Sequence, residues 1–396
     1  MGDLGASRAE LSAADWRAGG FGVYVHWPFC LAKCPYCDFN SHVARVIDQD
    51  AWADALVAEM RHMRALTGAR RAGTMFFGGG TPSLMAPRTV ARLIEEADRL
   101  WGLAEGAEIT LEANPTSVEA AKFQGYAAAG VNRVSMGVQA LDDADLKALG
   151  RMHSVAEARA AFDIARAAFR RVSFDLIYAR MGQTPEAWEA ELRAAIGMAI
   201  DHLSLYQLTI EEGTRFFDLH RRGRLSVPED AVAAEMYAIT QSLAAEAGMP
   251  AYEVSNHAAP GTESRHNLVY WRSGDYAGIG PGAHGRVTRA DGLRLATATE
   301  RAPGAWMAAV ACSGHALVEQ TPLSAAEHGD EMVLMGLRLA EGISLARYAA
   351  VAGRPLDAAR ISAMEAEGLV ERRGERLVAT PAGRLVLDRL LGELLA

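Results

Sequence analysis

Three cysteines stand close together in the sequence, at Cys30, Cys34 and Cys37, in the spacing C-x3-C-x2-C. Three thiolates on one loop can hold three corners of a cubane iron–sulfur cluster and leave the fourth iron open to a substrate or cofactor. The fourth cysteine, Cys312, stands alone far down the chain, and so tight a group in a reducing compartment is typical of a metal or redox site. Zinc is the alternative, but a structural zinc site needs four closed ligands. Three nearby side chains could supply the fourth ligand: His26, Asp38 and His42.

A second group of residues follows later strands of the predicted fold. The glycines Gly78–Gly80, ahead of Thr81 and Pro82, allow the backbone to approach a ligand closely, although the run is neither a P-loop nor a dinucleotide fingerprint. Four polar residues lie at or just after further strand ends: Glu112, Gln139, Arg151 and Asp175. Two carboxylates, an amide and a guanidinium are suited to a zwitterionic nucleoside, whose ammonium and ribose hydroxyls the carboxylates accept and whose carboxylate the arginine binds.

Alternating strands and helices are predicted to bring these residues together. Apolar runs predict strands at 22–26, 74–77, 108–112, 133–138, 172–177 and 202–208. Apolar residues spaced three and four apart predict helices between them, at 52–66, 89–100, 156–169 and 187–200. This alternation indicates a parallel α/β sheet with right-handed crossovers, either doubly wound or an incomplete barrel. Ligands collect at the carboxyl ends of such strands.

The composition is that of a globular protein with a sizeable core. The chain has 396 residues, 50% of them hydrophobic, and a net charge of −9 from 40 basic and 49 acidic residues. Such a length implies a large barrel with an appendage or two domains, and the negative charge argues against a duplex nucleic acid partner. The longest uncharged stretch, 302–318, is too broken by Pro303 and Gly304 for a membrane span. The first twenty residues show no secretory or myristoylation signal, so we expect a cytoplasmic protein.

Four segments are predicted. Residues 1–21 form a leader, 22–250 the partial barrel, 251–322 a connecting region rich in histidine and aromatic residues, and 323–396 a mainly helical domain. A short hairpin near the end gives this last domain a winged-helix-like pattern. Residues 356–396 hold six arginines, no lysine and seven acidic residues, so we expect the domain to pack against the barrel rather than to bind nucleic acid.

Together the motifs resemble the radical S-adenosylmethionine superfamily, within the group of oxygen-independent coproporphyrinogen III oxidase and the HemW-type heme chaperones. The resemblance covers nearly the whole chain and is carried by Tyr24-x-His26-x-Pro28-Phe29-Cys30, Gly78-Gly79-Gly80-Thr81-Pro82, Ser135-Met136-Gly137-Val138-Gln139 and Asp175-Leu176-Ile177-Tyr178. It implies an incomplete six-stranded TIM-like (β/α)6 barrel followed by a helical domain. It also implies a 4Fe-4S cluster on the three cysteines, with S-adenosyl-L-methionine on its open iron. The residues implied to line the S-adenosylmethionine site are Tyr24, Gly79, Gly80, Thr81, Glu112, Gln139, Arg151, Asp175, Thr209 and Ile279.

Three features of the sequence are similar to those of the chaperone branch rather than the oxidase branch of this group. Phe39 stands where the oxidase has a further cysteine, only about twenty residues precede the first strand, and His266-Asn267-Leu268-Val269-Tyr270-Trp271 matches an HNxxYW element linked to heme. The candidate heme residues are therefore His266, Asn267, Tyr270 and Trp271. In one place the sequence departs from its relatives, because Ala179-Arg180-Met181 replaces their Gly-Leu-Pro.

The leading hypothesis is a heme chaperone that binds heme and transfers it to acceptor apoproteins, including respiratory ones. This hypothesis does not decide whether the protein forms a homodimer, touches a membrane at its periphery or turns over as an enzyme. No catalytic residue is assigned. The alternative is a radical enzyme of porphyrin biosynthesis that decarboxylates coproporphyrinogen III oxidatively. A zinc protein with a winged-helix nucleic-acid function is a third hypothesis, which the charge balance disfavours.

Overall fold

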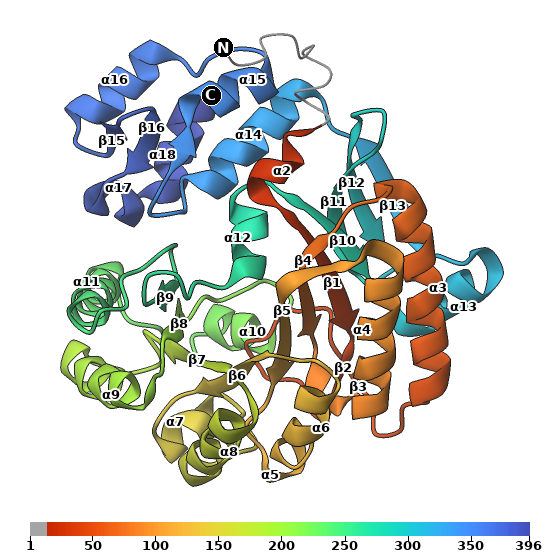
Figure 1. Cartoon of the computed structure of the whole chain (residues 1–396). Helices are drawn as coiled ribbons and strands as arrows, with labels where there is room; N and C mark the ends of the chain where they lie inside the picture. Colours follow the sequence, from red (N-terminus) through yellow and green to blue (C-terminus); the bar gives the residue numbers. More distant parts are fainter. Residues whose placement is uncertain (1–13) are drawn as a thin grey trace.

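The chain folds around one large mixed sheet, with a smaller helical part beside it (Figure 1). The structure is a computed structural model that describes residues 14–396, so most of the predicted leader lies outside the described residues. Six parallel strands pair in chain order and carry all six predicted strands. They are β1 (Phe21–Trp27), β4 (Ala72–Gly79), β5 (Leu103–Ala113), β6 (Arg133–Gln139), β7 (Arg171–Tyr178) and β8 (His202–Gln207).

The sheet extends beyond the six predicted strands. It has eleven strands in the order β13-β12-β11-β10-β1-β4-β5-β6-β7-β8-β9. The added strand β10 pairs parallel with β1, and the others extend the two edges in antiparallel fashion. These additions are β9 (Asn256–Ala258), β10 (Asp275–Ile279), β11 (His284–Thr288), β12 (Arg294–Thr299) and β13 (Leu317–Pro322). Residues 251–322 therefore supply sheet as well as a connection.

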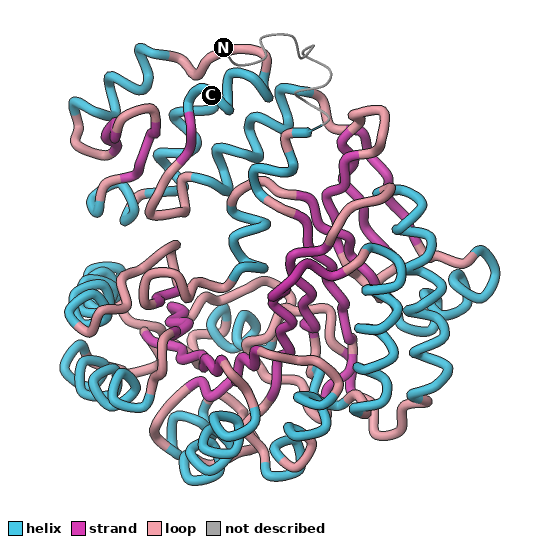
Figure 2. The backbone as a smooth tube through the Cα atoms, viewed as in Figure 1, coloured by secondary structure: helices cyan, strands magenta, loops and turns pink. Residues whose placement is uncertain are grey.

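The helices that link consecutive strands lie along the outside of the sheet (Figures 1 and 2). Because strands β1 and β4 to β8 follow one another without a reversal in order, their arrangement is not doubly wound. The linking helices are α3 (Gln49–Thr67), α4 (Pro87–Trp101), α5 (Ser117–Ala120), α6 (Phe123–Ala128), α7 (Asp143–Ala148), α8 (Val155–Ala168) and α9 (Pro185–Met198). The remaining elements before the C-terminal part are α2 (Trp16–Gly19), β2 (Phe29–Cys30), β3 (His42–Val43), the 3-10 helix η1 (Pro82–Leu84), α10 (Arg215–Arg221), α11 (Asp230–Glu246), α12 (Arg265–Trp271) and α13 (Pro303–Ser313).

Local sequence explains why these elements form where they do. Strand β1 alternates fully buried Val23 and Val25, which pack under the helices, with Tyr24 and His26 on the opposite face. Helix α8 begins at a capping box in which Ser154 and Glu157 satisfy one another's backbone N–H groups.

A second hydrophobic core lies in the C-terminal part, built from residues between Met332 and Leu394. This part holds a three-stranded sheet in the order β14-β16-β15 among five helices. Its elements are α14 (Ala325–Gly336), β14 (Ile343–Ser344), α15 (Leu345–Ala352), α16 (Ala358–Ala366), β15 (Val370–Arg373), β16 (Arg376–Ala379), α17 (Pro381–Leu385) and α18 (Leu387–Leu395).

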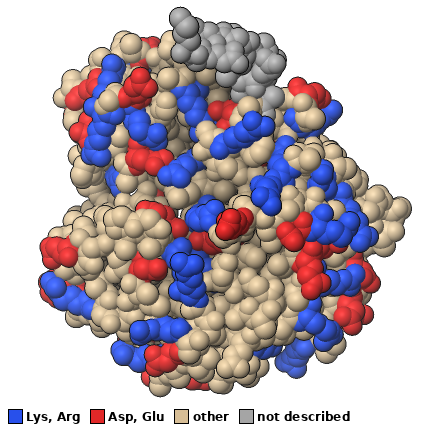
Figure 3. Space-filling view, in the orientation of Figure 1, with Lys and Arg blue, Asp and Glu red and all other residues tan. Residues whose placement is uncertain are grey.

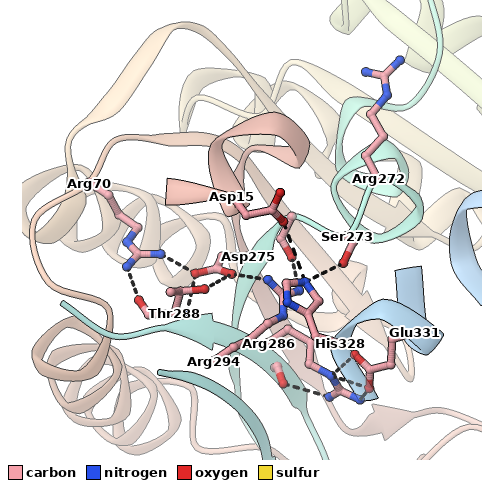
Figure 4. A network of polar contacts seen from close by, with 12 residues as sticks. Asp15, Arg70, Arg272, Ser273, Asp275, Arg286, Thr288, Arg294, His328 and Glu331 are labelled. Carbon is pink, nitrogen blue, oxygen red and sulfur yellow. Dashed lines mark hydrogen bonds and ion pairs between the residues drawn. The ribbon is translucent and has the colours of Figure 1, made fainter. Parts of the chain in front are cut away.

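A polar network lies where the two parts of the molecule meet (Figure 4). The carboxylate of Asp275, fully buried on β10, accepts hydrogen bonds from Arg70 at 2.5 Å and from Arg294 at 2.8 Å. Nearby, Asp15 binds Nε and Nη2 of Arg347 on α15, both at 2.8 Å. These charge-assisted bonds join the chain before β1 to a C-terminal helix.

Candidate functional site

A pocket of about 410 Å³ opens at the carboxyl ends of the parallel strands, where ligands of such sheets collect. The three clustered cysteines form one side of the pocket, and the strand ends form the rest. Of the residues predicted for the cofactor site, those that line it are Cys30, Cys34, Cys37, Gly79, Gly80, Thr81, Glu112, Gln139, Arg151, Asp175 and Thr209.

The cysteine loop is held against this pocket by a small parallel pairing of β2 with β3, Phe29 opposite His42 and Cys30 opposite Val43. Two of the sulfur atoms accept hydrogen bonds from the other side of the pocket. Thr81 Oγ1 donates to Cys30 Sγ and Arg151 Nη1 donates to Cys34 Sγ, each at 3.3 Å. Hydrogen bonds to sulfur are among the means by which proteins tune iron–sulfur clusters. Within residues 14–396, no three His, Cys, Asp or Glu side chains are grouped so as to hold a single metal ion.

Glycine is required in this run because its backbone lies very close to the neighbouring strand β1. Gly79 has a φ of 107°, and a Cβ at that position would lie 2.6 Å from the imidazole of His26. The amides of Gly80 and Thr81 then donate to the carbonyls of Trp27 and Phe29, at 2.7 and 2.8 Å. Glycine is thus the residue that lets this turn lie against the start of the cysteine loop.

Two carboxyl groups face the pocket from β5 and β7. Burial and the nearby Asp175 raise the pKa of Glu112 to about 8. Burial also raises the pKa of Asp175 to about 6, while Ser204, Arg133 and Ser135 act in the opposite direction. Because the pocket holds these two acids close together, a cationic or hydroxyl-bearing ligand relieves their mutual repulsion.

The opposite wall carries an arginine and an unsatisfied amide. Arg151 Nη2 donates to Asn114 Oδ1 at 2.6 Å and to the carbonyl of Gly137 at 2.8 Å. Gln139, with a φ of 73°, has a buried Oε1 atom without a hydrogen-bond partner. A buried amide oxygen left unpaired costs free energy, and a ligand donor in the pocket would satisfy it.

Two predicted residues do not line this pocket. Ile279 on β10 is fully buried within the main hydrophobic core. The hydroxyl of Tyr24 is 3.0 Å from His26 Nδ1, and burial raises the pKa of the phenol. A contact of these two residues with the ligand stays a prediction of the resemblance.

The sequence analysis missed several residues that do line it, among them Asn114, Tyr36, Ser135 and Tyr206. Asn114 bridges the two sides of the site, since its Nδ2 atom donates to Thr81 Oγ1 at 3.2 Å while its Oδ1 atom accepts from Arg151. Its position two residues after Glu112, at the same strand end, was the available signal.

Helix α12 carries the candidate heme residues and lies away from this pocket. His266 is buried, with Nδ1 2.7 Å from Thr74 Oγ1 and Nε2 2.7 Å from the hydroxyl of Tyr270. Burial lowers the pKa of His266 to about 3, so the ring is neutral and both nitrogens are engaged. Asn267, Tyr270 and Trp271 are partly exposed.

A second cavity of about 240 Å³ lies between α12 and the C-terminal part. Leu268 of α12 and Arg272, the residue after it, face Leu339, Ala340 and Glu341 across the cavity. Figure 3 shows the surface indented between the two parts. On the face that Figure 3 shows, basic and acidic side chains are intermixed. No helix among residues 14–396 has the length and apolar character needed to cross a membrane.

The fold and pocket define the class of protein. Residues 24–195 match the family described as the radical SAM superfamily, and residues 323–386 match the HemN C-terminal domain. The structure superimposes on coproporphyrinogen III oxidase (HemN) of Escherichia coli with a TM-score of 0.78, covering 100% of this chain and 93% of that one at 22% identity. The molecule therefore has the radical S-adenosylmethionine fold of that enzyme.

Sequence relatives identify the family within that class. Proteins named heme chaperone HemW are 38% identical in Mycobacterium tuberculosis, over 95% of both chains, and 38% identical in Escherichia coli, over 94% of this chain and 98% of that one. The mitochondrial radical S-adenosyl methionine domain-containing protein 1 of Bos taurus is 42% identical over 81% of this chain and 74% of its own. The chain belongs to the HemW family of radical S-adenosylmethionine proteins.

Proposed function

We propose that the protein is a heme chaperone, which binds heme and transfers it to acceptor apoproteins. The observation that carries the proposal is its likeness, over nearly the whole of both chains, to proteins named heme chaperone HemW. The superposition on HemN supports the fold alone at 22% identity, so the decarboxylation of coproporphyrinogen is an outcome to be tested rather than a second proposal.

The scaffold of this proposal carries a 4Fe-4S cluster on Cys30, Cys34 and Cys37. The donor set fits such a group, since Thr81 and Arg151 already donate to two of the sulfur atoms. When bound, the cluster supplies one open iron to which a cofactor can be chelated and through which an electron can pass. A thiolate-held cluster needs reduced cysteines, which supports the cytoplasm as the compartment.

S-adenosylmethionine is the cofactor that the pocket fits. Glu112 and Asp175 accept from its ammonium and hydroxyl groups, Arg151 binds its carboxylate, and the unpaired Oε1 of Gln139 accepts a further hydrogen bond. Gly79, Gly80, Thr81 and Thr209 complete the wall. Tyr24 contributes indirectly by supporting His26 beneath the glycine turn.

The heme site of the proposal lies on α12, at His266, Asn267, Tyr270 and Trp271. Buried His266, which bonds to Tyr270, fixes the helix against β4 through Thr74. The exposed side of the helix adjoins the second cavity, whose walls are mostly apolar and whose rim carries the ion pair Arg272–Glu341. An apolar wall with cations at its edge suits a porphyrin ring and its propionates.

Two finer parts of the fold belong to the same proposal. The six parallel strands form the incomplete (β/α)6 barrel of the superfamily, and residues 323–396 form a winged-helix-like domain whose hairpin, β15 with β16, packs on α16 and α18. Transfer to respiratory acceptors, dimerisation and a peripheral membrane contact are further parts of the proposal, and they rest on the sequence alone.

The test is anaerobic reconstitution of the cluster followed by titration with heme. We expect a saturable Soret band at about one heme per chain, and a weakened band in Trp271→Ala. The matched control is Phe217→Ala, which removes a partly exposed aromatic ring from α10 instead. If the reconstituted protein ignores heme but consumes S-adenosylmethionine with coproporphyrinogen, the chaperone proposal is wrong.

A further inference from the structure

One buried arginine beside the cofactor pocket has no part in the site described above. Arg180 lies in the turn after β7 and is only 3% exposed. Its Nη1 atom donates to the carbonyl of Ile177 at 2.5 Å, and its Nη2 atom donates to Asp145 Oδ2 and to Glu191 Oε2, both at 2.6 Å. A guanidinium is the one side chain that can serve three acceptors in fixed directions.

The two carboxylates that Arg180 binds both hold the segment after β6. Glu191, on α9, accepts through its second oxygen from the amide of Leu141 at 2.7 Å. Asp145 lies on α7 itself. Arg180 therefore holds residues 141–148 at two points. It binds Asp145 on α7 directly, and it reaches the amide of Leu141 through Glu191.

Residues of the pocket lie on either side of that segment. Gln139 stands two residues before Leu141, and Arg151 stands three residues after the last residue of α7. Arg151 donates to Cys34 Sγ at 3.3 Å. Between them Gly150 is so close to the cysteine loop that a Cβ there would lie 2.6 Å from Cδ of Pro35.

A small hydrophobic cluster transmits the position of α7 to the rest of the pocket. Leu146 and Leu149 pack with Ile177 of β7 and with Tyr36 of the cysteine loop. The ion pairs of Arg180 lie next to this cluster, since its acceptor carbonyl is that of Ile177. Packed interiors pass on displacements rather than absorbing them, so a shift of α7 moves both Arg151 and the cysteine loop.

We propose that Arg180 is a positioning residue for the cofactor site: it fixes α7 and thereby aims Gln139 and Arg151 at S-adenosylmethionine. The inference rests on the proposed function for the identity of that cofactor.

The test compares the reconstituted wild-type protein with Arg180→Leu. We expect the same iron content, a roughly tenfold larger Kd for S-adenosylmethionine by equilibrium dialysis, about 1.4 kcal/mol, and a smaller change in the reduced cluster's EPR spectrum when the cofactor is added. Asp145→Asn is the second variant should Arg180→Leu not fold. The side chain of Asp145 is 38% exposed. Because Arg180 keeps its contact with Glu191 in this variant, we expect the Kd for S-adenosylmethionine to rise only about threefold.

Two controls separate positioning from loss of stability. Arg193→Leu removes an exposed arginine of α9 that pairs only with Glu189 on the same helix. Leu192→Ala weakens the main core under α9 without touching the ion pairs, and we expect its folded fraction to bind the cofactor as the wild type does. Wild-type affinity and EPR response in both Arg180→Leu and Asp145→Asn would overturn the inference. Absence of cofactor binding in the wild type would instead contradict the proposed function.

Discussion

Arg151 joins the cysteine loop to the opposite wall of the pocket, because its Nη1 atom donates to Cys34 Sγ at 3.3 Å while Nη2 donates to Asn114 Oδ1 at 2.6 Å. Lysine keeps the charge but is a single point donor that cannot span both partners. We therefore expect Arg151→Lys to keep its cluster and to bind S-adenosylmethionine about tenfold more weakly. Titration calorimetry of the reconstituted protein measures the affinity.

Arg193→Lys is the matched control for this prediction, since Arg193 makes its ion pair on the surface of α9. An affinity for Arg151→Lys equal to that of the control would show that the planar guanidinium is not needed.

The contact of Gly150 with Pro35 leads to a second prediction. Gly150 and Gly182 have nearly the same positive φ, 70° and 69°, but a Cβ meets Pro35 only at Gly150 and finds open space at Gly182. Gly182→Ala should cost about 1 kcal/mol for the left-handed backbone alone. Gly150→Ala should cost more and should also lower the iron bound on reconstitution, because the cysteine loop has to move.

Urea unfolding and iron analysis of the two alanine variants check this prediction. Equal losses of stability and full iron content in both would mean that the cysteine loop yields without effect on the cluster.

Much of the fold was predictable, and the reason is physical. Parallel strands covered on one face by helices are rich in apolar residues, as β1 and β7 are, so their sequences stand out from the helices between them. The edge strand β13, Leu317–Pro322, is mostly exposed and contains Glu319, Gln320 and a proline. Nothing in such a segment separates a strand from a loop, and the extension of the sheet was missed.

The site was predictable in part for a similar reason. The polar residues after consecutive strands converge because those strands are parallel neighbours, which the alternation of elements already implied. The side on which a single residue faces was not predictable. His266 and Tyr270 are four residues apart on α12 and bond to one another, so the candidate heme histidine has its ring turned into the protein and away from solvent.

The pocket carboxyls predict how stability depends on pH in the protein without its cofactors. The pKa of Glu112 is raised to about 8, so between about pH 4.5 and 8 the folded state binds a proton that the unfolded state releases. The free energy of unfolding therefore falls as pH rises through this window. The slope is at most about 1.4 kcal/mol per pH unit, and water in the pocket reduces it.

Glu112→Gln should remove this contribution, leaving a slope only below about pH 6, where the raised pKa of Asp175 still acts, and should be more stable than wild type near pH 8. Urea unfolding at intervals from pH 5 to pH 8 measures the difference, with the exposed Glu105→Gln as the control. Parallel pH profiles for wild type and Glu112→Gln would contradict the raised pKa.

The last prediction concerns how the C-terminal part is held. Arg347 binds both carboxylate oxygens of Asp15 at 2.8 Å and also donates to the carbonyl of Arg272 at 2.7 Å. Arg347→Ala leaves Asp15, whose side chain is 10% exposed, without its main cation, and we expect a loss of about 1–3 kcal/mol. His328, 3.8 Å from Asp15, cannot compensate because burial lowers its pKa to about 3.

The control Arg354→Ala removes a 57% exposed arginine of the same part, 3.8 Å from Asp330, and should cost less than 0.5 kcal/mol, roughly the scale of a surface pair. Hydrogen exchange should then rise across α14 and α15 in Arg347→Ala alone, because this contact ties α15 to the chain before β1 and to the residue that follows α12; equal exchange in both variants would show that the second core holds its place without it.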